Sequence, residues 1–193
     1  MSQRYRVEAV FKTEGVPIYT FVEPPNYTEI LVDVRHPSKP VIIEGQSGTG
    51  KTVTIKKILT SVNGKSFQYL SPRKPNGLEE IQAVLKKPKK DTYVIDDFHR
   101  IPVEIQKAFA ELVKYAADME PQDIIYKFII IGINKVGNKL INFSPDLAKR
   151  ISIHQIKPGT EEAIQKLISA GEACLNITFS NKKLIFKETQ GDY

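Results

Sequence analysis

The sequence predicts an α/β fold built around a five-stranded parallel sheet. Short, wholly apolar runs such as Val41-Ile42-Ile43 recur along the chain, and such runs are typical of strands buried on both faces. Segments in which apolar residues recur at helical spacing separate these runs. Strands that alternate with helices in this way form parallel sheets, because each crossover helix returns the chain to the same edge.

The first elements come before the first wholly apolar run. Ile18-Tyr19-Thr20-Phe21-Val22 is expected to be a short strand, closed by Glu23-Pro24-Pro25. Asn26 is expected to cap a helix, because Glu29 follows three residues later in a capping-box pattern. His36-Pro37-Ser38-Lys39-Pro40 would end that helix, since proline disfavours helical backbone before it.

The remaining elements follow the same alternation. Thr160 is expected to cap the last clear helix, with Glu161 and Glu162 in its first turn and Gly171 as its stop. No closing helix is obvious in residues 176–193. Strands are expected at 41–43, 67–70, 92–95, 126–131 and 151–156, and further helices at 52–61, 76–85 (capped by Asn76) and 102–118.

The composition is that of a globular chain. Its 193 residues are 41% hydrophobic and 26% charged, which allows one domain with a sizeable core. No run of about 18 apolar residues is present, and no apolar stretch of a secretory signal follows the basic start. Cys174 is the single cysteine, so neither an internal disulfide nor a zinc cluster is expected. We expect a cytoplasmic protein with no membrane partner.

The charge leaves a nucleic-acid partner open. The formal net charge is +6, from 28 basic and 22 acidic residues. The densest basic cluster is Lys86-Lys87-Pro88-Lys89-Lys90, which would attract a polyanion but equally suits a solvated loop. The sequence contains no recognisable helix-turn-helix or zinc module, and this weighs against specific reading of DNA.

The strongest chemical signal is the segment Gly45-Gln46-Ser47-Gly48-Thr49-Gly50-Lys51-Thr52, which matches the P-loop pattern. Glycines let backbone N–H groups turn inward around phosphate oxygens, and the helix that starts here points its positive end at the same anion. Lys51 would neutralise the β- and γ-phosphates, and the Thr52 hydroxyl would bind Mg²⁺. A strand before the motif and a helix after it make an accidental match a poor alternative.

The second signal is a pair of carboxylates, Asp96 and Asp97, directly after the apolar run Tyr93-Val94-Ile95. Ligands bind in α/β folds at the carboxyl ends of strands, where this pair would lie. We expect Asp96 to hold Mg²⁺ and Asp97 to orient or deprotonate the attacking water. The alternative is a pair of helix caps before Pro102.

Two weaker candidates come later in the chain. Asn134 follows a long apolar strand, where its amide could bind the attacking water or the γ-phosphate. Arg150 precedes the last strand and could reach the γ-phosphate of a neighbouring subunit, with Lys149 as its nearest competitor. An ordinary turn asparagine and a helix-end arginine are the alternatives.

These four elements, in this order, resemble the AAA+ ATPases and their relatives. The phosphate-binding motif looks like Walker A, Asp96-Asp97 like the end of Walker B, Asn134 like sensor 1 and Arg150 like the arginine finger. The resemblance implies a three-layer P-loop NTPase sandwich with strand order 5-1-4-3-2 and a small helical lid. It also implies ATP and Mg²⁺ as cofactors, nucleotide at subunit interfaces, and a homo-oligomer that forms on ATP binding.

The chain departs from the AAA+ pattern in two places. The second Walker B carboxylate is Asp97, where most AAA+ members have Glu; a double Asp is also common in the STAND signalling ATPases. Asn134 is nonetheless similar to AAA+, since many STAND proteins carry Arg there. The lid stops before a recognisable sensor 2 arginine, so the chain resembles a fragment or a minimal module, with a protein partner or fused effector domain as a further possibility.

We therefore expect an N-terminal segment at 1–25, a P-loop NTPase core at 26–157 and a partial lid at 158–193. The expected function is an ATP-binding and ATP-hydrolysing module that couples nucleotide state to conformational change or assembly. A STAND-like switch with little turnover and a nucleic-acid-associated ATPase are the alternatives. ATP is favoured over GTP because Asn134-Lys135-Val136-Gly137 lacks the closing Asp of the guanine motif.

Overall fold

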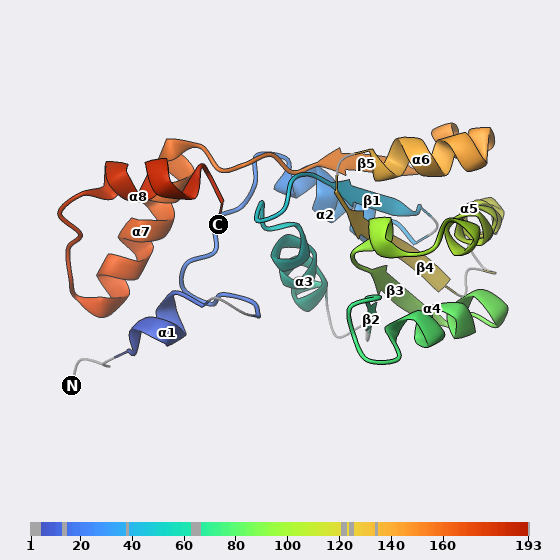
Figure 1. Ribbon diagram of the computed structural model, residues 1–193, viewed down its shortest axis with the longest axis horizontal. Coiled ribbons are helices and arrows are strands. Elements are labelled where there is room, and N and C mark those ends of the chain that lie inside the picture. Colours follow the sequence, from blue (N-terminus) through green and yellow to red (C-terminus); the bar gives the residue numbers. More distant parts are fainter. Residues whose placement is uncertain are drawn as a thin grey trace.

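A single parallel sheet forms the centre of the computed structural model, which describes residues 5–12, 15–37, 39–62, 67–120, 123, 126–133 and 135–192. Its strand order is β2-β3-β4-β1-β5, which is the expected order 5-1-4-3-2 read from the other edge. Figure 1 shows helices on both faces of the sheet, as in a three-layer sandwich. The strands are β1 (Val41–Glu44), β2 (Phe67–Leu70), β3 (Asp91–Ile95), β4 (Tyr126–Gly132) and β5 (Ser152–Gln155).

The helices alternate with these strands along the chain. α3 follows β1, α4 follows β2, α5 follows β3, and α6 lies between β4 and β5. Two short 3₁₀ helices, Phe98–Arg100 and Pro145–Lys149, complete the connections. The α-helices are α1 (Val7–Val10), α2 (Tyr27–Arg35), α3 (Lys51–Ser61), α4 (Gly77–Lys86), α5 (Val103–Asp118), α6 (Val136–Phe143), α7 (Glu161–Leu175) and α8 (Lys182–Thr189).

The sheet is buried on both faces, which explains the apolar runs in the sequence. Successive side chains of a strand point to opposite faces. Phe128 and Ile130 of β4 therefore pack with α4, α5 and α6, whereas Ile129 and Ile131 pack with α2 and α3. All seven residues of β4, at the centre of the sheet, are buried.

The register brings the chemical motifs to one edge of the sheet. β4 pairs on one side with β1 (Ile42 opposite Ile130) and on the other with β3 (Ile95 opposite Ile130). The strands that lead into the glycine loop and into the two aspartates thus end on either side of the same strand. Parallel pairing places these carboxyl ends together, although about 50 residues separate them in sequence.

α7 and α8, which fall in the segment that the sequence analysis expected to be a lid and are called the lid helices below, lie to one side of the sheet together with α1 (Figure 1). A Cβ built on Gly171 of α7 would lie 2.0 Å from Phe11 Cζ, so the ring of Phe11 packs directly on the helix backbone. Phe11 also meets Phe179 edge to face, with centroids 6.2 Å apart. The N-terminal segment is therefore packed against the lid.

Two predictions near the N-terminus are wrong. Residues 18–22 form no strand; Thr20 Oγ1 instead donates to the carbonyl of Val10 at 2.9 Å, which ties this segment back to α1. Asn26 precedes α2 but makes no capping hydrogen bond with its side chain. Its Nδ2 donates instead to the carbonyl of Gln155 at 3.2 Å, which links α2 to β5.

The lid differs from the sequence prediction in two further ways. Gly171 does not stop α7, which continues to Leu175 and ends at Asn176 in the left-handed conformation (φ 55°). Gly171 is needed for the approach of Phe11 and not for a helix end. The segment after it contains a helix, α8, which Asn181 caps by accepting a hydrogen bond from Leu184 N. The expected cap of α7 by Thr160 is confirmed.

Two other helix boundaries depart from the expected pattern. Asn76 precedes α4 in the left-handed conformation (φ 59°) and makes no side-chain cap. α6, which the sequence analysis did not anticipate, follows β4 directly. Within the described ranges, no helix combines the length and the apolarity needed to cross a bilayer.

Candidate nucleotide site

The loop between β1 and α3 has the backbone geometry of an anion-binding cradle. Residues 45–50 connect the strand to the helix, and Gly48 and Gly50 both have φ of +80°, a conformation that suits glycine. Gly50 directly precedes the first turn of the eleven-residue α3. The first N–H groups of a helix have no partner within the helix, so the start of α3 and the positive end of its dipole suit an anion at this loop. Residues 45–52 are called the phosphate loop below.

Gly45 fixes the start of the phosphate loop against the chain that leaves β5. A Cβ on Gly45 would lie 2.1 Å from the carbonyl oxygen of Ile156. Ile156 N in turn donates to the carbonyl of Glu44 at 2.8 Å. Any side chain at position 45 would thus push the backbone at Ile156 away from the backbone at Glu44, to which it is hydrogen-bonded.

Internal contacts close the phosphate loop on itself. Thr49 is buried, and its hydroxyl donates to the carbonyl of Gln46 at 3.0 Å. The ammonium group of Lys51 donates to the same carbonyl. Burial lowers the pKa of Lys51, and the charges of Asp96, Asp97 and Asp192 oppose that shift. The ammonium group of Lys51 therefore lies against the backbone of the loop.

Thr52 and Asp96, which the sequence analysis assigned to a magnesium site, lie together at the end of β3. Thr52 Oγ1 donates to Asp96 Oδ2 at 2.6 Å, and Asp96 is 7% exposed. Asp96 Oδ1 accepts from Asp97 N at 2.7 Å. In the part of the chain that the structure describes, no group of three or more His, Cys, Asp or Glu could hold a metal ion. The hydroxyl and carboxylate oxygens fit Mg²⁺, which takes few protein ligands besides phosphate oxygens.

Tyr69 is a site residue that the sequence analysis missed. Its hydroxyl donates to Asp96 Oδ2 at 2.5 Å, so that oxygen accepts from both Tyr69 and Thr52. The ammonium groups of Lys56 and Lys74 lie 4.4 and 4.8 Å from the centre of the ring. Burial, and then the hydrogen bond to Asp96, raise the pKa of Tyr69. The phenol therefore keeps its proton and acts as a donor to Asp96.

Asp97 lies near two cations, one from the loop after β2 and one from the 3₁₀ helix that follows it. Arg73 Nε lies 2.9 Å from Asp97 Oδ2, and Arg100 Nε lies 4.0 Å from Oδ1. The Ser71 hydroxyl approaches Oδ2 at 3.4 Å. Asp97 also adopts the left-handed conformation (φ 53°), which is uncommon outside glycine. In this arrangement one carboxylate oxygen of Asp97 is paired with Arg73.

Of the two later candidates, only Arg150 can be placed relative to this cluster, and it lies away from it. Asn134 lies outside the described residues. Arg150 precedes β5 and therefore lies at the amino edge of the sheet, because Ser152 pairs with Val41 at the start of β1. Its Nε contacts Asp118 Oδ1 at 2.5 Å, and another guanidinium nitrogen donates to the carbonyl of Asp146 at 2.9 Å. Arg150 is thus remote from the phosphate loop of its own chain.

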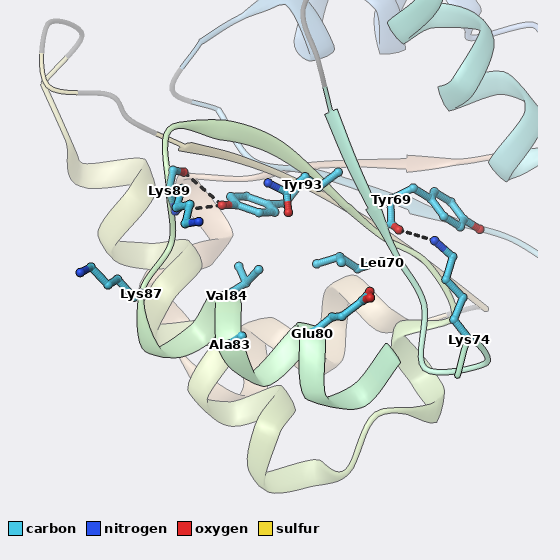
Figure 2. Close-up of a pocket in the computed structure, with 10 residues that line it drawn as sticks. Tyr69, Leu70, Lys74, Glu80, Ala83, Val84, Lys87, Lys89 and Tyr93 are labelled. Atoms are coloured by element: carbon cyan, nitrogen blue, oxygen red, sulfur yellow. Dashed lines mark hydrogen bonds between the residues drawn. The ribbon is translucent and has the colours of Figure 1, made fainter. Parts of the chain in front are cut away.

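A separate pocket of about 680 Å³ lies between β2 and α4 (Figure 2). It contains no residue of the phosphate loop. Lys87 and Lys89, from the basic cluster of the sequence analysis, line it together with the apolar side chains of Leu70 and Val84. Lys74 donates to the backbone carbonyl of Tyr69 at 2.6 Å, which covers one acceptor of the edge strand.

A family model describes the part of the chain that contains these motifs. The model for the novel STAND NTPase 3 family matches residues 21–120, which is more than half of the sequence. The chain belongs to this STAND NTPase family. It is therefore a P-loop NTPase, and this supports nucleotide as the ligand class of the phosphate loop. No curated protein matches the chain.

Several solved AAA+ structures share the fold of this STAND NTPase. The RuvB Holliday junction branch migration motor of Thermotoga maritima has a TM-score of 0.58 and 20% identity, covering 86% of this chain and 56% of its own. Cdc6p from Pyrobaculum aerophilum gives 0.56 and 18%, over 86% and 53%. Domain III of the Thermotoga maritima replication initiation protein DnaA gives 0.59 and 20%, over 86% and 76%. The chain thus spans about half the length of RuvB and Cdc6p.

Proposed function

We propose that this STAND NTPase module binds ATP with Mg²⁺ at the phosphate loop and hydrolyses it, and that nucleotide state controls the position of the lid. The observation that carries the proposal is the meeting of Thr52 and Asp96, at 2.6 Å, beside the phosphate loop. P-loop NTPases use a hydroxyl at the start of the helix that receives the phosphates and a carboxylate at the end of a strand for Mg²⁺, and Thr52 and Asp96 have these positions.

The residues divide the chemistry as follows. Backbone N–H groups of the phosphate loop and the Lys51 ammonium group bind the β- and γ-phosphates. Thr52 and Asp96 hold Mg²⁺, which supplies charge neutralisation on the phosphate oxygens when bound. Asp97 orients or deprotonates the water that attacks the γ-phosphorus, and it must first separate from Arg73. Asn134 is retained as a second contact to that water.

A nucleotide switch with little turnover is a second candidate, and a specific observation favours it. The ion pair between Arg73 and Asp97, at 2.9 Å, occupies the only carboxylate assigned to activate water. A chain that keeps this pair after ATP binds would retain the nucleotide without cleaving it. The family match to STAND NTPases is consistent with this alternative.

We further propose that the chain self-associates when ATP binds. Arg150 lies at the edge of the sheet opposite the phosphate loop, so it could serve a γ-phosphate only in a second copy of the chain. The division into an N-terminal segment (1–25), core (26–157) and lid (158–193), and a cytoplasmic location, are retained as parts of this proposal.

The experiment that tests the proposal measures binding and turnover on the same sample. ATP with Mg²⁺ is added to the wild-type chain, phosphate release is followed, and bound nucleotide is identified after rapid removal of free nucleotide. Phosphate release with ADP recovered supports the ATPase, and ATP recovered intact supports the switch. Absence of bound nucleotide at millimolar ATP would overturn both. GTP serves as the comparison, and it is expected to bind more weakly.

A further inference from the structure

A carboxylate from the end of the lid lies directly on the phosphate loop. A Cβ built on Gly48 would lie 2.5 Å from Asp192 Oδ2 and 2.7 Å from Oδ1. Both oxygens are therefore in contact with the backbone face of Gly48, one of the two left-handed glycines of the loop. Figure 1 shows the segment after α8 turning toward the loop that precedes α3.

A folded turn sets the position of this carboxylate. α8 ends at Gln190 in the left-handed conformation (φ 51°), and Gly191 follows with φ of +85°. Gly159 N donates to the carbonyl of Gly191 at 2.7 Å, and Asp192 N donates to the carbonyl of Thr189 at 2.9 Å. A Cβ on Gly191 would lie 2.5 Å from the carbonyl oxygen of Gly159, so only glycine allows this approach.

The same turn connects the site to the lid. Gly159 belongs to the segment that joins β5 to α7, and Gly191 follows α8. α8 is in turn fixed to α7 by Lys182 and Glu172, whose charged atoms are 2.5 Å apart. Residues 190–192 are thus joined to both lid helices, and the contact of Asp192 with Gly48 links them to the core.

The charge of Asp192 suits the place it occupies. The phosphate loop combines left-handed glycines, a helix N-terminus and the Lys51 ammonium group, all of which favour an anion. The Asp192 carboxylate is such an anion. A polyphosphate could not bind beside it, because the two negative charges repel each other and Asp192 already covers the backbone of Gly48.

We propose that Asp192 is an intramolecular occupant of the phosphate site, which the phosphates of a nucleotide must displace before they bind. Displacement breaks the contact between Asp192 and Gly48 and so frees the lid to move, because Gly159 and Gly191 join residues 190–192 to the rest of the lid. This inference rests on the proposed nucleotide site and adds to it an internal competitor. In the absence of nucleotide, the chain would therefore be in a closed state, in which the carboxylate of Asp192 keeps the lid on the phosphate loop.

The test compares ATP affinity among the wild type, Asp192→Asn and Asp192→Ala, with Glu188→Gln as control. Glu188 is exposed on α8, so this control removes the same charge four residues away. Both Asp192 variants should bind ATP more tightly, by about tenfold if the closed state holds about nine-tenths of the molecules. Glu188→Gln should match the wild type. Thermal unfolding checks that each variant is folded, which the exposed position of Asp192 favours.

The outcomes separate this inference from the proposed function. If the wild type binds ATP and all variants bind equally, the nucleotide site stands and the internal competitor is excluded. If the Asp192 variants bind ATP more weakly, Asp192 belongs to the nucleotide site and the inference is also overturned. If neither the wild type nor Asp192→Ala binds ATP, both are wrong, because removal of the carboxylate exposes no phosphate site.

Discussion

Tyr69 and Asp96, 27 residues apart in the sequence, meet at 2.5 Å across two neighbouring strands. The contact joins the edge strand β2 to the carboxylate that we assign to Mg²⁺. Asp96 Oδ2 also accepts from Thr52, so one oxygen is oriented by a residue of the sheet and by a residue of the phosphate-loop helix. The position of Asp96 is therefore fixed before any cation binds.

Tyr69→Phe is expected to raise the Mg²⁺ concentration needed for half-maximal turnover, by about tenfold. The change removes one hydrogen bond to a charged group, worth about 1.5–3 kcal/mol, and leaves the ring between the two lysines. Tyr93→Phe is the control, since Tyr93 is a buried tyrosine of β3 whose hydroxyl bonds only Lys89 in the described chain. An unchanged Mg²⁺ dependence in Tyr69→Phe would show that Tyr69 does not position Asp96.

Asp97→Asn is expected to keep ATP affinity and stop hydrolysis, because an amide cannot accept a proton while Asp96 still serves Mg²⁺. Phosphate release and ATP binding are measured on the same preparation. Asp123→Asn, at an exposed turn, controls for the lost charge. Loss of ATP binding in a folded Asp97→Asn would contradict this division of roles, and unchanged turnover would exclude Asp97 as the base.

Arg73→Ala is expected to raise turnover several-fold, since it removes the guanidinium that engages Asp97 at 2.9 Å. The comparison is Arg100→Ala, because Arg100 lies 4.0 Å from the other oxygen and restrains Asp97 less. A drop in turnover with Arg73→Ala would mean that Arg73 assists the reaction and does not restrain it.

Arg150→Ala is expected to lower turnover per subunit with little change in ATP affinity, if Arg150 acts on a second copy. Turnover per subunit should then rise with protein concentration, and mixing Arg150→Ala with Asp97→Asn should partly restore activity. Lys149→Ala is the control, from the adjacent exposed position. A flat concentration dependence and wild-type turnover in Arg150→Ala would leave only its ion pair with Asp118.

Glu172→Gln is expected to lower the Tm at neutral pH, because Glu172 bonds Lys182 and accepts from Phe179 N at 2.7 Å. The hydrogen bond from Lys182, and then that from Phe179, lower the pKa of Glu172. Its contribution is therefore present above the ordinary glutamate pKa, about 4.3, and is lost as the pH falls through the lower folded pKa. The difference in Tm between Glu172→Gln and the wild type should therefore vanish at pH values below that folded pKa. An equal loss in the exposed Glu162→Gln would contradict this assignment.

The strands and the phosphate loop could be predicted from the sequence because their evidence is local. The apolar run of β4 and the eight residues of the phosphate loop each carry their pattern within a single segment. The parallel sheet then forces the ends of β1 and β3 together, so the meeting of Thr52 and Asp96 was also predictable. The strand order came from the resemblance to AAA+ ATPases.

Tyr69 and Arg73 could not be predicted in the same way. The expected strand order placed β2 beside β3, but nothing within residues 67–73 indicates that the side chains of Tyr69 and Arg73 reach the two aspartates. Gly171 looked like a helix stop because glycine favours helix ends, but contact with Phe11, 160 residues away, decides its position. The role of Asp192 could not be predicted for the same reason, since only the folded lid brings it to Gly48.

The most direct test of the central claim is an ATP titration of Lys51→Ala against the wild type, with Lys107→Ala as control. Lys107 is an exposed lysine of α5. Loss of one charge-assisted contact of about 1.5–3 kcal/mol predicts ATP binding weaker by about 10- to 100-fold in Lys51→Ala. Lys107→Ala should bind as the wild type does. Wild-type ATP affinity in a folded Lys51→Ala would contradict the assignment of the phosphate loop as the nucleotide site.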